Sequence, residues 1–240
     1  MKEEFTIDRV KRLKKDKDYY NLFRYCQYHA KGSNLDAIYE LGNCYRHGWG
    51  CDQSELHAHL IYTELTRLGY VPAMSAMAWD YYEGKGVNQS YRRAFRFFKE
   101  ACQYNDLDAM FNIALMYFNG TGIEKDATLA VRYFEKAAVL GHVRSQFNLG
   151  ICYHKGWGVS QDLVKSHYWL SQAANQGYHK AGEYLGQLPS YYVLEDLERV
   201  SEQLESIEQE IDGPVNVDKI LRKIRRTLDQ IEEETQNEHE

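Results

Sequence analysis

The sequence repeats itself with a fixed period of 36 residues. One copy begins at Ala109, and the same step reaches Ala37, Ala73, Ser145 and Ala181. A Gly-x-Gly pair recurs with this period, at Gly48/Gly50, Gly84/Gly86, Gly120/Gly122 and Gly156/Gly158. No insertion interrupts the pattern between residues 37 and 188. A fixed period of this length is typical of a helical solenoid, in which each repeat is one supersecondary unit.

The first half of each repeat predicts a helix. Ala109, Ile113 and Tyr117 are spaced four apart and share one helical face. Beside this face runs a column of very small residues at Gly42, Ala78, Ala114, Gly150 and Gly186. Glycine inside a helix costs about 1 kcal/mol relative to alanine. We therefore expect that a neighbouring helix passes too close to this column for a larger side chain.

The second half of each repeat predicts another helix. The Gly-x-Gly pair ends the first helix, because glycine adopts the left-handed conformation without steric cost. Good N-cap residues follow, at Ser54, Ser90, Asp126 and Asp162. The next residues place small and apolar side chains at i, i+4 and i+7, the buried stripe of an amphipathic helix. These positions are Ala58/Tyr62/Leu65, Ala94/Phe98/Ala101, Ala130/Phe134/Ala137 and Ser166/Leu170/Ala173.

The segments LGNCYRHGWGC, LGICYHKGWGV and VRYFEKAAVLGH carry a family resemblance. They resemble the Sel-one-like repeat (SLR) family, a relative of the tetratricopeptide repeat. Four consecutive copies and a terminal half copy match its pattern, with mild departures such as Cys51 and Asn105. The resemblance implies an all-α fold, a right-handed α-solenoid of helix pairs, that acts as a protein-binding scaffold. Regulators, assembly factors and neutralising partners of bacterial effectors are roles that it allows.

Three regions follow from these patterns. Residues 1–35 are expected to form N-terminal helices with a half-repeat cap, because Leu22 and Cys26 lie one period before Ala58 and Tyr62. Residues 36–189 hold the four repeats and the terminal half repeat. The heptad spacing of apolar residues within 190–240 predicts an amphipathic helical hairpin that turns at Gly213-Pro214 and ends in an acidic tail. This hairpin could cap the last repeat, form a homodimer or occupy the inner groove of the array.

Composition excludes some classes of partner. The net charge of −6 favours neither nucleic acid nor an anionic membrane. No apolar run approaches the roughly 20 residues of a membrane span, and the N-terminus does not resemble a secretory signal. We therefore expect a cytoplasmic protein with reduced thiols. Secreted cysteine-rich SLR proteins pair a second-helix cysteine with one eight residues later, whereas Cys102 is followed there by Met110.

The expected docking surface lies on the first helix of each repeat. In tetratricopeptide arrays this helix lines the concave face, and several of the corresponding positions here are aromatic or aliphatic beyond what the repeat core needs. Such apolar patches usually mark partner sites, and a groove for a protein or peptide partner is the prediction. The alternative is that tight curvature packs these side chains on each other. The predicted positions are Tyr39, Asn43, Arg46, Trp79, Tyr82, Phe111, Leu115, Phe118, Phe147, Ile151 and His154.

Chemistry-bearing patterns are weak. Cys44, His47 and Cys51 have spacing that can hold zinc, but Cys44 recurs as Cys152 in a core column. Cys152 and His154 stand two apart on a helix and do not face each other. We predict no catalytic residue, metal or cofactor, and hence a non-enzymatic scaffold. The alternatives are a β-lactam-binding hydrolase like the secreted cysteine-rich relatives, and a protein that self-assembles through its C-terminal heptads.

Overall fold

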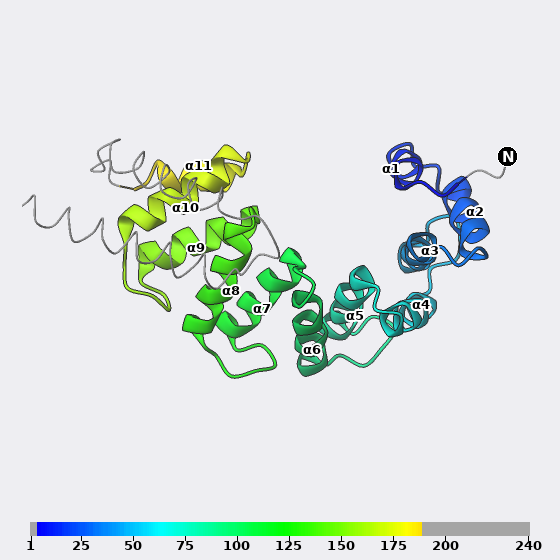
Figure 1. The fold of residues 1–240 in the computed structure, drawn as a ribbon, viewed down its shortest axis with the longest axis horizontal. Coiled ribbons are helices and arrows are strands. Elements are labelled where there is room, and N and C mark those ends of the chain that lie inside the picture. Colours follow the sequence, from blue (N-terminus) through cyan, green and yellow to red (C-terminus); the bar gives the residue numbers. More distant parts are fainter. Residues whose placement is uncertain (1–3, 189–240) are drawn as a thin grey trace, which may run out of the picture. The chain divides into compact units, whose positions relative to one another are not determined.

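The computed structural model describes residues 4–188, and these residues form eleven α-helices and no strand. The predicted all-helical class is thus confirmed for this part of the chain (Figure 1). The helices are α1 (Ile7–Lys15), α2 (Tyr19–Ala30), α3 (Leu35–His47), α4 (Glu55–Arg67), α5 (Val71–Glu83), α6 (Tyr91–Cys102), α7 (Leu107–Asn119), α8 (Ala127–Val139), α9 (Val143–Lys155), α10 (Leu163–Asn175) and α11 (His179–Leu185).

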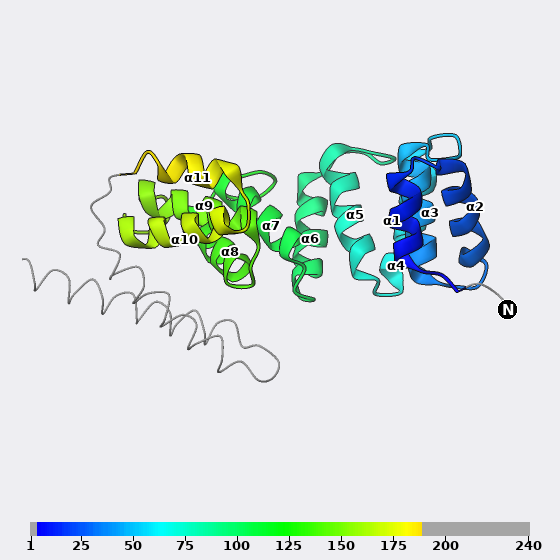
Figure 2. The ribbon, with the colours of Figure 1, turned by 90° about the horizontal axis from the view of Figure 1, so that it is seen from above.

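The chain forms two compact units. Unit 1 comprises Met1–Ala109 and Thr121–Ile123, and unit 2 comprises Met110–Gly120 and Glu124–Glu240. Within unit 1, each helix from α1 to α6 packs on the next one (Figures 1 and 2). Within unit 2, α8, α9, α10 and α11 pack consecutively in the same way. Each unit is therefore a stack of helices in chain order, as the short connections of a solenoid require.

The helix ends follow the predicted chemistry. Gly48 ends α3 in the left-handed conformation at φ 70°, and Gly84 and Gly156 do the same for α5 and α9. The Asp126 side chain accepts a hydrogen bond of 2.9 Å from the Leu129 backbone N–H at the start of α8. Ser54, Ser90 and Asp162 cap α4, α6 and α10 in the same manner. The loop and cap signals of the sequence are confirmed.

The column of small residues marks close helix packing. A Cβ added at Gly42 would lie 2.7 Å from the Tyr62 ring, and one added at Gly150 would lie 2.6 Å from Leu170. Both distances are below ordinary van der Waals contact, so the second helix of the repeat passes directly over the glycine of the first. The prediction is confirmed at these two positions. Gly186, in the same column, has no such neighbour among the described residues.

The second glycine of each Gly-x-Gly pair has a different role, which the repeat pattern does not predict. A Cβ at Gly86 would lie 2.5 Å from the carbonyl oxygen of Glu55, the first residue of α4. Gly50 lies equally tightly against Tyr19 at the start of α2, and Gly158 against Ala127 at the start of α8. The loop of one repeat therefore rests on the first turn of the preceding second helix, and only glycine fits there.

The cores of the units are built from the predicted stripes. In unit 1, Ala58, Tyr62 and Leu65 of α4 are fully buried. In unit 2, Ala130 and Phe134 of α8 are equally buried. Fully burying a large apolar side chain contributes about 1.5–3 kcal/mol, so these columns supply much of the stability of each helix pair.

The N-terminal region packs into unit 1. Leu22 and Cys26 of α2 are completely buried, and Val10 of α1 joins their cluster. The Tyr25 hydroxyl donates to the Glu4 carbonyl oxygen at 3.1 Å and accepts from the Thr6 N–H at 2.9 Å. The segment before α1 is thus fastened to α2. The predicted C-terminal hairpin, residues 190–240, lies outside the described residues.

Candidate docking surfaces on the first helices

The most exposed aromatic side chain among the predicted site residues, Trp79, lies on α5 in unit 1. Trp79 keeps 37% of its surface exposed. Its ring centroid is 5.6 Å from that of Phe98, which is buried beneath it, and 5.4 Å from that of Tyr82. Tyr82 in turn contacts Tyr91 at 5.0 Å, edge to face. We call Trp79, Tyr82 and Tyr91 the aromatic cluster of unit 1; it presents ring surface to solvent from a rigid, buried base.

The predicted residues on α3 are engaged inside unit 1. Tyr39 is half-buried between Tyr62 and Tyr70, at ring distances of 5.5 and 5.6 Å. This burial, followed by the nearby charge of Glu40, raises the pKa of the Tyr39 hydroxyl. Asn43 accepts a 2.9 Å hydrogen bond from the Tyr62 hydroxyl and donates one of 3.2 Å to Glu40. These polar groups are already paired, so they offer little to an incoming partner.

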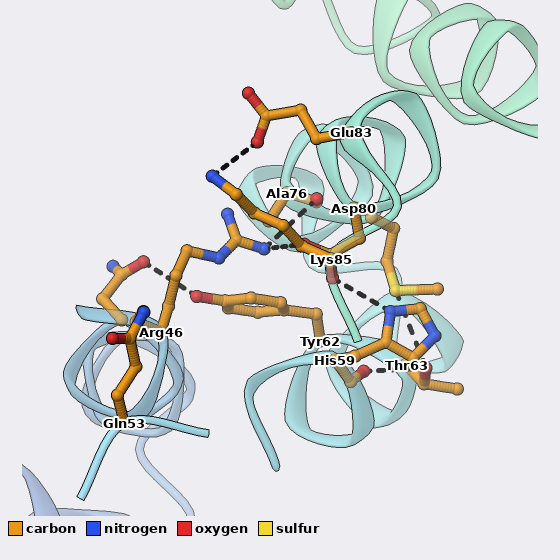
Figure 3. Close-up of polar contacts among 11 residues, drawn as sticks. Arg46, Gln53, His59, Tyr62, Thr63, Ala76, Asp80, Glu83 and Lys85 are labelled. Carbon is orange, nitrogen blue, oxygen red and sulfur yellow. Dashed lines mark hydrogen bonds and ion pairs between the residues drawn. The ribbon is translucent and has the colours of Figure 1, made fainter. Parts of the chain in front are cut away.

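Arg46 closes a buried ion-pair network (Figure 3). Its guanidinium pairs with the Asp80 carboxylate and lies 4.6 Å from the centroid of the Tyr62 ring. His59 donates from Nδ1 to the other carboxylate oxygen of Asp80 at 2.9 Å. Asp80 is only 1% exposed. Burial raises the pKa of its carboxyl, and the hydrogen bond from His59 and the charge of Arg46 oppose that rise.

This network fastens three helices of unit 1 together, because Arg46 belongs to α3, His59 to α4 and Asp80 to α5. Asp80 is not among the residues predicted from the sequence, although its column contains a signal: it reads Cys44, Asp80, Met116 and Cys152. A carboxylate in an otherwise apolar core column indicates a buried pair. Since a buried charge without its partner is costly, the network favours a single arrangement of these helices.

In unit 2, the expectation that Phe111 is open to a partner is wrong. Its side chain is 6% exposed and belongs to the core around Phe134. The ring centroid lies 5.8 Å from that of Phe134 and 5.3 Å from that of His142. The guanidinium carbon of Arg144 lies 4.6 Å from the Phe111 ring centroid. Side chains of its own repeat, together with Arg144 of the following one, therefore cover a position that the sequence pattern assigned to the open face.

The other predicted residues of unit 2 are half-buried. Leu115 and Phe118 of α7 pack against the core cluster, and the Phe118 ring lies 5.5 Å from that of Trp157, which is 46% exposed. We call Leu115, Phe118 and Trp157 the apolar patch of unit 2. Ile151, on α9, is half-buried as well. In this patch only Trp157 is exposed, whereas Trp79 and Tyr91 are both exposed in the aromatic cluster of unit 1.

Phe147 and His154, also on α9, contact α11 and its N-cap residue. Phe147 lies 5.0 Å from the ring of Tyr178 and 6.3 Å from that of Tyr184. His154 Nδ1 lies 2.7 Å from the Tyr184 hydroxyl. Burial and then the charge of Lys155 lower the pKa of His154. At this end of unit 2, side chains of successive first helices pack on each other, which was the alternative to a free surface.

Reactive groups do not converge in the described part of the chain. Residues 4–188 contain no group of three His, Cys, Asp or Glu side chains placed to hold a metal ion. Cys44 is buried, whereas the His47 ring stacks on Trp49 at 4.5 Å. Burial, followed by the charge of Glu135, raises the pKa of the Cys152 thiol to about 12, which leaves it unreactive near neutral pH. None of the five cysteines forms a disulfide in the structure.

The fold and these surfaces define a helical-repeat protein with aromatic side chains on its first helices. A family model of the Sel1 repeat matches residues 35–70, 71–105, 107–142 and 143–178. The chain therefore belongs to the Sel1 repeat family, whose members are generally protein-interaction scaffolds.

Solved structures agree with this assignment. A Sel1 repeat protein from Oxalobacter formigenes is 29% identical in sequence and superposes with a TM-score of 0.64. The match covers 70% of this chain and 49% of the Oxalobacter chain. A protective antigen of uropathogenic Escherichia coli with an SLR fold is 24% identical and gives a TM-score of 0.65. The match covers 88% of this chain and 42% of the antigen, and it supports the fold alone. This chain thus spans less than half the length of either structure.

None of the curated proteins matches this sequence. Within residues 4–188, the longest helices have 13 residues, and none combines the length and apolar character needed to cross a membrane.

Proposed function

We propose that this chain is a non-enzymatic scaffold that binds a protein or peptide partner through the first helices of its repeats. The observation that carries the proposal is the aromatic cluster of unit 1. Trp79 rests on the buried ring of Phe98, yet more than a third of its own surface is exposed. Exposed tryptophan and tyrosine on a rigid base are typical of binding hot spots, because little conformational entropy is lost when a partner covers them.

The neighbouring polar groups favour this cluster over α3. Arg46 and Asn43 are committed to the network with Asp80, Tyr62 and Glu40, so their role is to hold α3, α4 and α5 in place. In unit 2, the apolar patch of Leu115, Phe118 and Trp157 is the proposed second contact. Phe111 is excluded from the proposal by its burial.

We further propose that the protein works in a reducing compartment such as the cytoplasm. The buried thiols of Cys26 and Cys44 form no disulfide, although they are close enough to share a hydrogen bond. In an oxidising compartment, neighbouring thiols of this kind would tend to form a disulfide.

Affinity purification with a matched pair of variants tests the docking proposal. One variant carries Trp79→Ala and Tyr82→Ala; the control carries Leu60→Ala and Tyr104→Ala, which remove side chains that are exposed elsewhere in unit 1. We expect the wild type and the control to recover the same partner from the native cell extract, and the Trp79/Tyr82 variant to lose it. Helicity and melting temperature should be alike in all three proteins. Equal recovery by both variants would contradict the proposal.

A further inference from the structure

Within residues 4–188, the face of α11 that carries Gly182 and Gly186 lacks the cover that the same face has in the earlier first helices. Positions one, two, three and four periods before Gly186 are all buried, whereas Gly186 is exposed. Gly182 is exposed too, although the equivalent positions in α5, α7 and α9 are buried. The earlier residues of these two columns are Gly42, Ala78, Ala114 and Gly150, and Ile38, Met74, Met110 and Gln146.

In complete repeats, this face is covered by the second helix of the same repeat. Tyr62 covers Gly42, and Leu170 covers Gly150, each from a position 20 residues further along the chain. Among residues 4–188, a Cβ added at Gly186 would meet only the backbone oxygens of Glu183 and Gly182, at 3.6 and 3.8 Å. A helical face kept free of side chains is therefore left without its second helix among residues 4–188.

The chain leaves the described region at this face. Leu188 is nearly buried and packs in the cluster of Leu170, Ala173 and Ala181. The sequence that follows keeps the apolar spacing of a second helix but shifts its register. In the last complete repeat, the buried stripe of the second helix is Ser166, Leu170 and Ala173. A step of 36 residues from this stripe reaches polar side chains, at Glu202, Ser206 and Gln209. A step of 34 residues reaches apolar side chains instead, at Val200, Leu204 and Ile207.

The sequence after Leu188 has the polarity pattern of a helix at the end of an array. Residues 190–212 contain one basic side chain, Arg199, against eight acidic ones: Glu195, Asp196, Glu198, Glu202, Glu205, Glu208, Glu210 and Asp212. Their apolar seam is thus accompanied by a strongly polar side, which is the pattern of a helix that buries one face and exposes the other.

We propose that residues 193–211, which lie outside the described residues, supply the second helix of the last repeat. Their apolar seam packs on α11 with Leu204 over Gly186, as Leu170 packs over Gly150, after a connection that is two residues shorter. The acidic outer face then closes the end of the array, which a solenoid needs for solubility. This inference stands apart from the proposed function, because it concerns neither the aromatic cluster nor a partner protein.

Disulfide trapping in the full-length chain tests the register. One variant carries Gly186→Cys with Leu204→Cys; the matched control carries Gly186→Cys with Ser206→Cys, the position of the uninterrupted 36-residue step. After mild oxidation, peptide mapping should find an intrachain 186–204 bond, and about tenfold less of the 186–206 bond, because disulfide geometry is strict. Peptide mapping also separates these bonds from any that involve the natural cysteines.

Three results would overturn the proposal: equal yields for the two pairs, no 186–204 bond, or bonds that join two chains, which would make a second copy the occupant. Hydrogen–deuterium exchange gives an independent readout if the cysteine variants fold poorly. In the full-length chain, Leu204→Asp should speed exchange of the amides in residues 179–188 at least about tenfold, while Leu228→Asp should leave them unchanged. No change with Leu204→Asp, or the same change with both variants, would refute it.

Discussion

Replacing Gly86 by alanine tests how one repeat is fastened to the next. Gly86 is the second glycine of its Gly-x-Gly pair, and an added Cβ would lie 2.5 Å from the Glu55 carbonyl oxygen and 2.8 Å from its carbonyl carbon. Both are backbone atoms at the start of α4, so neither can rotate away. Gly69 is a matched control, because its φ of 76° resembles the 70° of Gly86 but nothing lies within 4 Å of its added Cβ.

The two substitutions separate backbone strain from packing. Gly69→Ala should cost only the left-handed conformation, about 1–2 kcal/mol. Gly86→Ala adds a collision in a tightly packed contact, for which overpacking costs about 1–3 kcal/mol. The expected loss is therefore about 2–5 kcal/mol in free energy of unfolding for Gly86→Ala, and the difference between the variants measures the contact between repeats.

Urea unfolding followed by circular dichroism gives this difference. The comparison uses midpoints and slopes of both variants and the wild type, because repeat arrays do not always unfold in one step. A lower slope for Gly86→Ala alone would indicate that the array has split into separately unfolding parts, which agrees with a broken contact. Losses that agree within about 0.5 kcal/mol, with equal slopes, would refute the stacking role of the second glycine.

Two further predictions concern buried ionisable groups. Asp80→Ala should destabilise the protein by about 3 kcal/mol, because Arg46 would stay buried without its counter-charge. The control Glu64→Ala, which breaks the exposed pair with Arg67, should cost below about 1 kcal/mol. Urea unfolding measures both losses, and equal losses would contradict the stabilising role of the network. The Cys152 thiol has its pKa raised from 9.0 to about 12 in the fold, so its stabilising contribution is complete below pH 9 and is lost as the pH rises toward 12. Cys152→Ala should therefore lose less stability than the wild type between about pH 8 and pH 10, and parallel pH profiles would count against this.

The sequence predicted the helix pairs well because their signals are local. The left-handed glycine at Gly84 and the N-cap at Ser90 lie at the helix ends they specify, and both have the predicted conformation. The close approach at Gly150 was also predictable, since a costly residue recurred in one column. In each case the residue acts on its own helix or on the other helix of the same repeat.

Contacts between repeats were harder to predict. The fit of Gly86 against Glu55 depends on how successive repeats pack, which periodicity does not give. The burial of Phe111 has this origin in part, because Arg144 of the next repeat lies over its ring. Asp80 could not be predicted from the periodic pattern, because it is the residue that departs from its column of cysteine and methionine.

Calorimetry with the partner recovered by affinity purification tests the central claim most directly. It measures the dissociation constant for the wild type, Trp79→Ala and Leu60→Ala. We predict that Trp79→Ala raises the dissociation constant at least about tenfold, which corresponds to 1.4 kcal/mol, while its thermal midpoint stays that of the wild type. Leu60→Ala should leave both quantities unchanged. An unchanged affinity for Trp79→Ala, or a loss of affinity only in step with a loss of folding, would contradict the proposed docking surface.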